Sequence, residues 1–99
     1  MIEILRIQEF ENWLIVQSAK TQALVESRLF RLEYYGHFGD SKSLGGGMCE
    51  LRSRNGIRIY FTGLGNAKIL ILYGGDKNGQ KKDIKKARAL LRRFTKEET

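Results

Sequence analysis

Two arginines and a tyrosine near the middle of the chain have side chains suited to binding and cleaving a phosphodiester. Arg52 and Arg58 flank a turn, and Tyr60 follows two residues after the second arginine. Guanidinium groups match phosphate oxygens two at a time. A tyrosine can stack on an unpaired base or transfer a proton through its hydroxyl. These residues therefore predict a nucleic-acid site in which Arg52 and Arg58 bind phosphate and Tyr60 assists.

The turn between the arginines can be built in two ways, and the apolar pattern distinguishes them. A two-residue turn at 55–56 would put Arg52 opposite Ile59 and mix polar with apolar residues on each face. A three-residue turn at 54–56, with its glycine in the left-handed conformation, puts Arg52 opposite Arg58 and collects the apolar residues on the other face. We therefore predict the three-residue turn.

In this register the polar face carries Glu50 opposite Tyr60 beside the two arginines, and we expect this face to be open to solvent. Like charges directly opposite on a sheet repel each other, so Arg52 and Arg58 need compensation. Glu50 could form an ion pair with one guanidinium, or a phosphate could bind both. The pattern leaves these two alternatives open.

A glycine-rich segment, residues 74–80, joins the last predicted strand to the last helix and carries Lys77. Its glycines let the backbone approach a ligand closely, and amides at the start of the helix favour an anion. We include Lys77 among the phosphate-binding and catalytic candidates. Arg54, Gln80 and Asp83 are further candidates from the same neighbourhood.

The elements that would position these residues form an α+β fold in the order β-α-α-β-β-β-α. Apolar periodicity predicts a helical hairpin packed on a mostly antiparallel four-stranded sheet, in two layers, with a C-terminal helix. The strand at 67–73 is apolar on both faces and is expected to be central, and the glycine-rich stretch 37–47 is expected to be a loop. The predicted strands are 2–7, 48–53, 57–62 and 67–73, and the predicted helices are 10–19, 21–36 and 84–94.

Charge and composition narrow the class of protein. The net charge is +7, and it divides as −2 over residues 1–40, +4 over 41–75 and +5 over 76–99. A positive field confined to the second half favours a polyanion or an acidic partner. The chain is expected to form a single domain over 1–99, in the cytoplasm and away from membranes, because it has one cysteine and no long apolar run.

Three other conspicuous residues are interpreted as structural. Trp13 falls on the apolar face of the first helix and Cys49 on the core face of its strand. His37 is the only histidine and has no second metal ligand beside it. We therefore expect no metal and no cofactor.

Three motifs in order along the chain resemble the RelE/ParE toxin superfamily, in its HigB-like, addiction-module killer branch, which also includes phage-derived Gp49-like proteins. The likeness covers nearly the whole length. The residues that carry it are Glu50-Leu51-Arg52, Gly56-Ile57-Arg58-Ile59-Tyr60-Phe61, Gly75-Asp76-Lys77, Gln80, Asp83, Ile84 and Ala87.

The resemblance implies the toxin of a type II toxin–antitoxin system, inhibited by a cognate antitoxin, usually a helix-turn-helix protein encoded next to it. RelE-like members cleave messenger RNA without a metal, typically on the ribosome, and so inhibit translation. Arg58 is similar to the arginine of the third family segment, and Lys77 to the basic residue after the last strand. Asp83 stands where the better-known RelE pattern has a tyrosine. The general acid or base is therefore left open among Tyr60, Lys77 and Asp83, and the structural alternative for Asp83, a cap or a salt bridge of the last helix, is favoured over catalysis.

Two other functions fit the same elements. A ParE-like toxin would bind DNA gyrase and need no catalytic residues, whereas Arg52, Arg58 and Tyr60 form a concentrated phosphate site that favours the endoribonuclease. A non-toxic nucleic-acid-binding regulator is the third alternative, and the absence of a helix-turn-helix pattern disfavours it.

Overall fold

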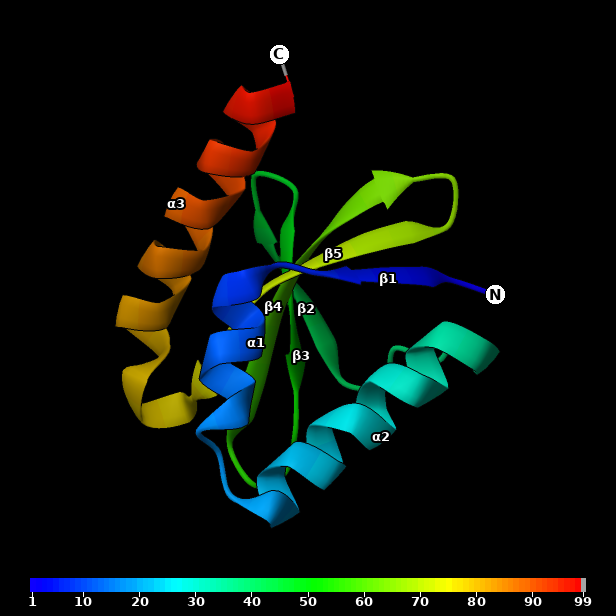
Figure 1. Cartoon of the computed structure of the whole chain (residues 1–99), viewed down its shortest axis with the longest axis vertical. Coiled ribbons are helices and arrows are strands. Elements are labelled where there is room, and N and C mark those ends of the chain that lie inside the picture. The colour runs from blue at the N-terminus through cyan, green and yellow to red at the C-terminus, as the bar shows by residue number, and fades with distance from the viewer. Residues whose placement is uncertain (99) are drawn as a thin grey trace.

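A five-stranded mixed sheet forms the centre of the computed structural model, which describes residues 1–98 and side chains as far as Lys96 (Figure 1). The strands lie in the order β1-β5-β4-β3-β2; β1 runs parallel to β5 and all other neighbours are antiparallel. Their bounds are β1 Glu3–Arg6, β2 Ser41–Gly45, β3 Met48–Arg52, β4 Ile57–Gly65 and β5 Lys68–Asp76.

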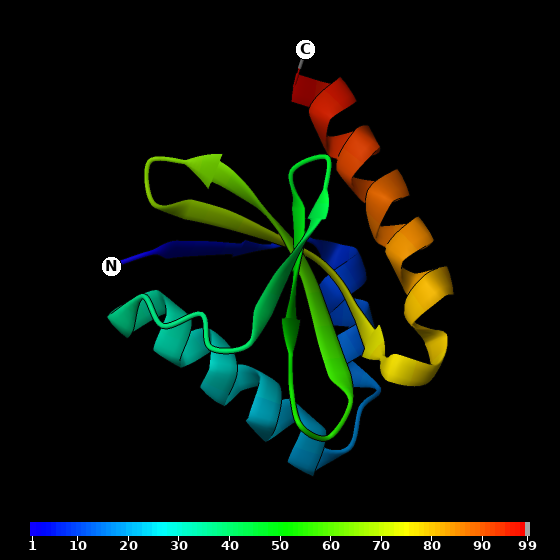
Figure 2. The same ribbon diagram turned by 180° about the vertical axis from the view of Figure 1, so that it is seen from behind.

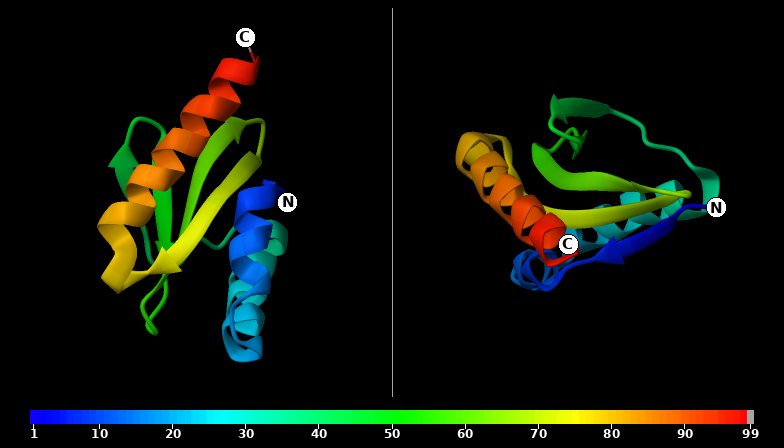
Figure 3. Two further views of the ribbon diagram at one scale, coloured as in Figure 1. Left: turned by 60° about the vertical axis from the view of Figure 1, so that its left-hand side comes forward. Right: turned by 90° about the horizontal axis from the view of Figure 1, so that it is seen from above.

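Helices cover both faces of this sheet (Figure 3). On one face α1, Gln8–Ile15, and α2, Ala19–Tyr35, pack against Ile69 and Ile71. On the other, α3, Gln80–Glu98, packs against Leu70 and Leu72. The apolar strand β5 is therefore buried on both faces and flanked by two strands, which confirms the prediction that it is central. The predicted two-layer arrangement was wrong, because α3 adds a third layer.

The predicted four-stranded sheet was also wrong, because the segment 37–47 contains strand β2. Lys42 pairs with Glu50 and Ser43 with Cys49 at the edge of the sheet. An edge strand with mostly exposed side chains needs no apolar alternation, so its sequence resembles a loop. The described residues thus add one strand to the expected order, giving β-α-α-β-β-β-β-α.

A single residue caps each end of α2: Ser18 at the start and Gly36 at the end. Ser18 accepts a hydrogen bond from the Thr21 amide at 3.1 Å, so the cap lies three residues before the expected one. Gly36 ends the helix with φ +63°, as predicted. Within α2, Arg28 donates to the carbonyl oxygens of Arg52 and Phe38 at 2.7 and 2.9 Å, and so ties the helix to the end of β3.

The three-residue turn between β3 and β4 was correctly predicted. Arg52 lies opposite Arg58 and Glu50 opposite Tyr60. Gly56 has φ +92°, which an L-residue rarely adopts. The register that places the candidate side chains on one face is therefore the one that the apolar pattern indicated.

The last connection is short and returns the chain over the sheet. A single turn of 3-10 helix, η1, Lys77–Gly79, links β5 directly to α3. Within residues 1–98, no helix combines the length and apolar character that a membrane span requires.

Candidate nucleic-acid interface

The basic candidates gather at one end of the sheet, where the β3–β4 turn lies beside the β5–α3 connection (Figure 2). Arg58 is paired with Arg52 on β3 and with Gly75 on β5. The aliphatic part of Lys77 lies against the turn, since its Cγ would be 3.4 Å from a Cβ placed on Gly56. The structure therefore brings Arg52, Arg58 and Lys77 together, and we call these three residues the basic end.

The face that carries these arginines is not open to solvent, and this expectation was wrong. Glu50 and Tyr60 both have 0 % exposure. The start of α3 covers them, and Gln80 donates through Nε2 to the two Glu50 carboxylate oxygens at 3.2 and 3.0 Å. Arg52 and Arg58, nearer the end of the sheet, remain half-buried. Tyr60 consequently cannot stack on a base.

The two opposed arginines are compensated unequally. Glu50 Oε1 lies 3.5 Å from Arg52 Nε, so Glu50 forms an ion pair with one guanidinium. Arg58 donates from Nη1 to the Ile57 carbonyl at 3.3 Å, but its buried Nε has no hydrogen-bond partner among the residues described. Since a buried donor without a partner costs free energy, Arg58 is prepared to bind an acceptor that this chain does not supply.

Tyr60 places a second unsatisfied group close to Arg58. Its buried hydroxyl has no hydrogen-bond partner within the described part of the chain. Burial, followed by the negative charges of Glu50 and Asp83, raises the pKa of Tyr60 well above its ordinary value. The hydroxyl therefore stays protonated at neutral pH and can act only as a donor or as a neutral acceptor.

Asp83, in the first turn of α3, packs closely on two glycines. A Cβ on Gly75 would lie 1.9 Å from Asp83 Oδ2, and one on Gly79 would lie 3.1 Å away. Burial and the nearby charge of Asp76 raise the pKa of Asp83. Asp76, not Asp83, caps η1 by accepting from the Asn78 and Gly79 amides at 2.8 and 3.1 Å.

Glu50 has a larger structural role than the sequence predicted. Glu50 was expected only as a possible ion-pair partner on an open face, yet it is the fully buried acceptor that joins Gln80 to Arg52. The signal present in the sequence was its position opposite Tyr60 on the sheet. Of the additional candidates, Gln80 joins this cluster, whereas Arg54 is exposed in the turn.

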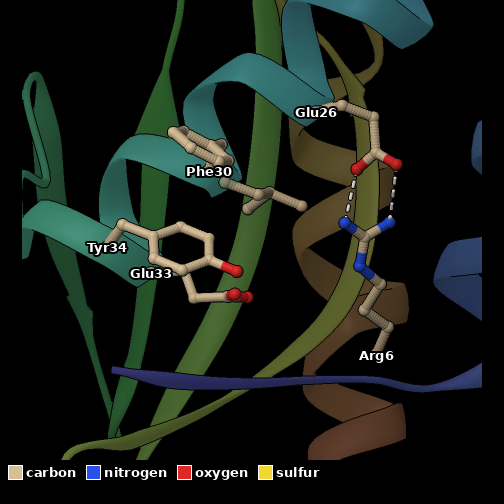
Figure 4. Close-up of a pocket in the computed structure, with 6 residues that line it drawn as sticks. Arg6, Glu26, Phe30, Glu33 and Tyr34 are labelled. Carbon is tan, nitrogen blue, oxygen red and sulfur yellow. Dashed lines mark hydrogen bonds and ion pairs between the residues drawn. The ribbon is translucent and has the colours of Figure 1, made fainter. Parts of the chain in front are cut away.

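A different hollow lies between β1 and α2 (Figure 4). Arg6 extends from β1 to form a bidentate ion pair with Glu26 on α2, and it also lies 3.4 Å from Glu11. Phe30 and Tyr34 pack together along the exposed side of α2, with ring centroids 4.6 Å apart. In this hollow, which we call the acidic groove, the cation is neutralised by carboxylates of the same chain.

Comparison with known proteins finds a relative by sequence and solved structures with the same fold. An uncharacterized protein of Haemophilus influenzae is 37 % identical over 92 residues, covering 90 % of this chain and 92 % of that protein. No family model matches the chain.

Solved structures with this fold include the isolated Escherichia coli RelE toxin and the intact Escherichia coli RelBE toxin–antitoxin complex. Each aligns with a TM-score of 0.65 over 77 % of this chain, at 9 % identity, and the alignments cover 84 % and 96 % of the respective chains. A conserved hypothetical protein of Helicobacter pylori aligns with a TM-score of 0.50 at 13 % identity, over 79 % of this chain and 97 % of that one.

Proposed function

This chain belongs to the family of the Haemophilus influenzae protein and has the RelE fold, and from this premise we propose that it is the toxin of a type II toxin–antitoxin system. Its proposed activity is metal-free endonucleolytic cleavage of messenger RNA on the ribosome, which inhibits translation. We assign it to the HigB-like, Gp49-like branch on the motifs around Glu50, Arg58 and Lys77.

The observation that carries the proposal is the unsatisfied Nε of Arg58 at the basic end. Arg58 is half-buried, has a free Nε, and lies next to a second arginine and an exposed lysine. These donors suit a phosphodiester, whose two non-bridging oxygens can each accept a hydrogen bond. Native proteins rarely leave such donors without a partner, and a ligand is one of the few reasons to do so.

In the reaction the ribose 2′-OH loses its proton to water and its oxygen bonds to the adjacent phosphorus, in line with the departing 5′-oxygen, which leaves a 2′,3′-cyclic phosphate. Arg52 and Arg58 would stabilise the negative charge that builds on the phosphoryl oxygens. Lys77 is exposed at the basic end and would protonate the leaving oxygen as the bond to phosphorus breaks. Tyr60 lies buried behind Arg58, so we assign it a positioning role, together with Glu50, which holds Arg52.

A RelE-like toxin must be silenced in the cell that makes it. We propose a cognate antitoxin, a helix-turn-helix protein encoded next to this gene, that covers the basic end. The proposed substrate places the protein in the cytoplasm, with messenger RNA and the ribosome as its targets.

Induction of the protein followed by mapping of messenger RNA ends tests this function. We expect new ends with the intact protein, none with Arg58→Ala, and unchanged cleavage with His37→Ala, because His37 is exposed and outside the basic end. Intact messages with arrested DNA replication would contradict the nuclease and favour a gyrase-binding toxin instead.

A further inference from the structure

A pocket of about 290 Å³ lies between α1 and the start of α3, at the end of β5, and the proposed cleavage chemistry does not use it. It opens beside the basic end, because Ile57 in its wall precedes Arg58 and Asp76 precedes Lys77. This size is close to the lower limit of about 300 Å³ for small-molecule sites. Its lining consists of Trp13, Gln17, Ile57, Tyr73, Gly74, Gly75, Asp76, Gly79, Lys82 and Asp83.

Aromatic rings and bare backbone form the apolar part of the pocket. The Trp13 ring lies directly on β5, since a Cβ on Gly74 would be only 2.5 Å from its Cε3 atom. Trp13 contacts the core as expected but is only half-buried, as is Tyr73. The two glycines of β5 let the Trp13 ring and the Asp83 carboxylate lie close to the strand, and flat aromatic surfaces suit the stacking of a nucleic-acid base.

The ionisable side chains of the pocket are the carboxylates of Asp76 and Asp83 and the ammonium group of Lys82. The Asp83 carboxylate lines the pocket and forms no hydrogen bond or ion pair with any residue in the described range. The other carboxylate, Asp76, already uses Oδ1 to accept from two amides of η1. Asp83 is therefore the carboxylate in the pocket wall that can accept from a ligand with donors, and it has two oxygens to offer side by side.

We propose that this pocket binds a guanine base of the RNA, packed against Trp13 and Tyr73 and hydrogen-bonded through N1–H and the 2-amino group to the Asp83 carboxylate. Guanine presents two adjacent donors on its Watson–Crick edge. Adenine and cytosine present one amino group beside an acceptor nitrogen, which a carboxylate repels, and uracil presents a single N–H between two carbonyls. The inference rests on the proposed ribonuclease function. It adds recognition of one RNA base, next to the phosphate that the basic end would bind.

Titration of the ¹⁵N-labelled protein with GMP and with IMP, which lacks the 2-amino group, tests the pocket without any variant. We expect the amide signals of Gly74, Gly75 and Gly79 to shift, and GMP to bind about tenfold or more tightly than IMP, the discrimination that one good bidentate contact provides. Equal affinities, or shifts confined to Arg52, Arg58 and Lys77, would refute base recognition and leave only phosphate binding.

Two matched variants assign the preference to the carboxylate. Asp83→Asn keeps the side-chain size but replaces one acceptor with a donor, so the GMP-to-IMP ratio should fall to near one. Asp40→Asn makes the same change at an exposed aspartate outside the pocket and should keep the ratio. A ratio that survives in Asp83→Asn would overturn the assignment.

Mapping of messenger RNA ends separates failure of the pocket from failure of the proposed function. Cleavage of messages without discrimination between GMP and IMP would remove the guanine pocket and keep the ribonuclease. Discrimination between the nucleotides with intact messages would keep the pocket and remove the ribonuclease.

Discussion

The acidic groove and the guanine pocket have the same volume, about 290 Å³ each, but differ in how their charged groups are satisfied. In the groove, the guanidinium of Arg6 is paired with Glu26 and Glu11. In the pocket Asp83 has no such partner among the described residues, and at the adjoining basic end neither does Arg58 Nε. The two hollows are therefore not distinguished by their size, but they are distinguished by whether their charged groups are paired within the chain.

We expect Arg58→Ala to have the largest effect, on the cleavage rate, of the variants that test this comparison. Loss of one preorganised donor to a developing oxyanion costs about 10²- to 10³-fold in rate, so single-turnover cleavage of ribosome-bound message should fall by that factor. Arg6→Ala removes an arginine whose charge is already neutralised and should keep the rate. Equal losses in the two variants would mean that the pairing of charges does not distinguish the two regions.

Gly74→Ala should be the largest change in stability at the pocket. The added methyl would meet the Trp13 ring at 2.5 Å, and overpacking of this kind destabilises by about 1–3 kcal/mol. Gly63→Ala is the matched control, because a Cβ there meets nothing within 4 Å. Urea unfolding measures both free energies, and equal values would show that Trp13 does not lie against the strand.

Arg6→Ala should have a small effect on the free energy of unfolding. Arg6 and Glu26 are partly exposed, with side-chain exposures of 29 % and 51 %, and such ion pairs contribute about 1 kcal/mol or less. The loss should shrink in high salt, which screens exposed charges. A loss of several kcal/mol by urea unfolding would contradict a purely surface role for the groove.

The smallest expected effect is the change in stability with pH that comes from ionisation of Asp83. Because burial and Asp76 raise its pKa in the folded state, the folded protein binds this proton more tightly than the unfolded chain does, and stability is lost as the pH rises through the folded pKa. Asp83→Asn should therefore raise Tm at pH 7, with a gain that vanishes toward about pH 3, below the ordinary pKa of aspartate. A gain independent of pH would contradict the assigned cause.

The sequence was most informative where alternation along one strand decides the structure. The register of Arg52 with Arg58 follows from the apolar residues of the β3–β4 hairpin, since a two-residue turn would mix polar with apolar side chains on each face. Strand β2 escaped prediction because exposed edge positions such as Lys42 carry no periodic signal. Its pairing depends on backbone hydrogen bonds, which the side-chain pattern does not encode.

The burial of the site could not be predicted for a different physical reason. Whether Tyr60 faces solvent depends on which side of the sheet α3 crosses, and that is a tertiary choice made at the short η1 connection. The hydrogen bond between Gln80 and Glu50, thirty positions apart, can form only when α3 lies on this side of the sheet. The residues of the basic end were thus identified from the sequence. Only the structure shows that Arg52 has an ion-pair partner whereas Arg58 Nε has none among the described residues.

The salt dependence of RNA affinity tests most directly the contrast between the paired Arg6 of the acidic groove and the cations of the basic end. A short single-stranded RNA made uncleavable by 2′-deoxy substitution is titrated at several salt concentrations. Removal of one cation that binds a phosphate of a single strand reduces the magnitude of the slope of log affinity against log salt by about 0.7. We predict that reduction for Arg58→Ala and for Lys77→Ala, and an unchanged slope for Arg6→Ala. The same slope in all three variants and the unsubstituted protein would contradict the account.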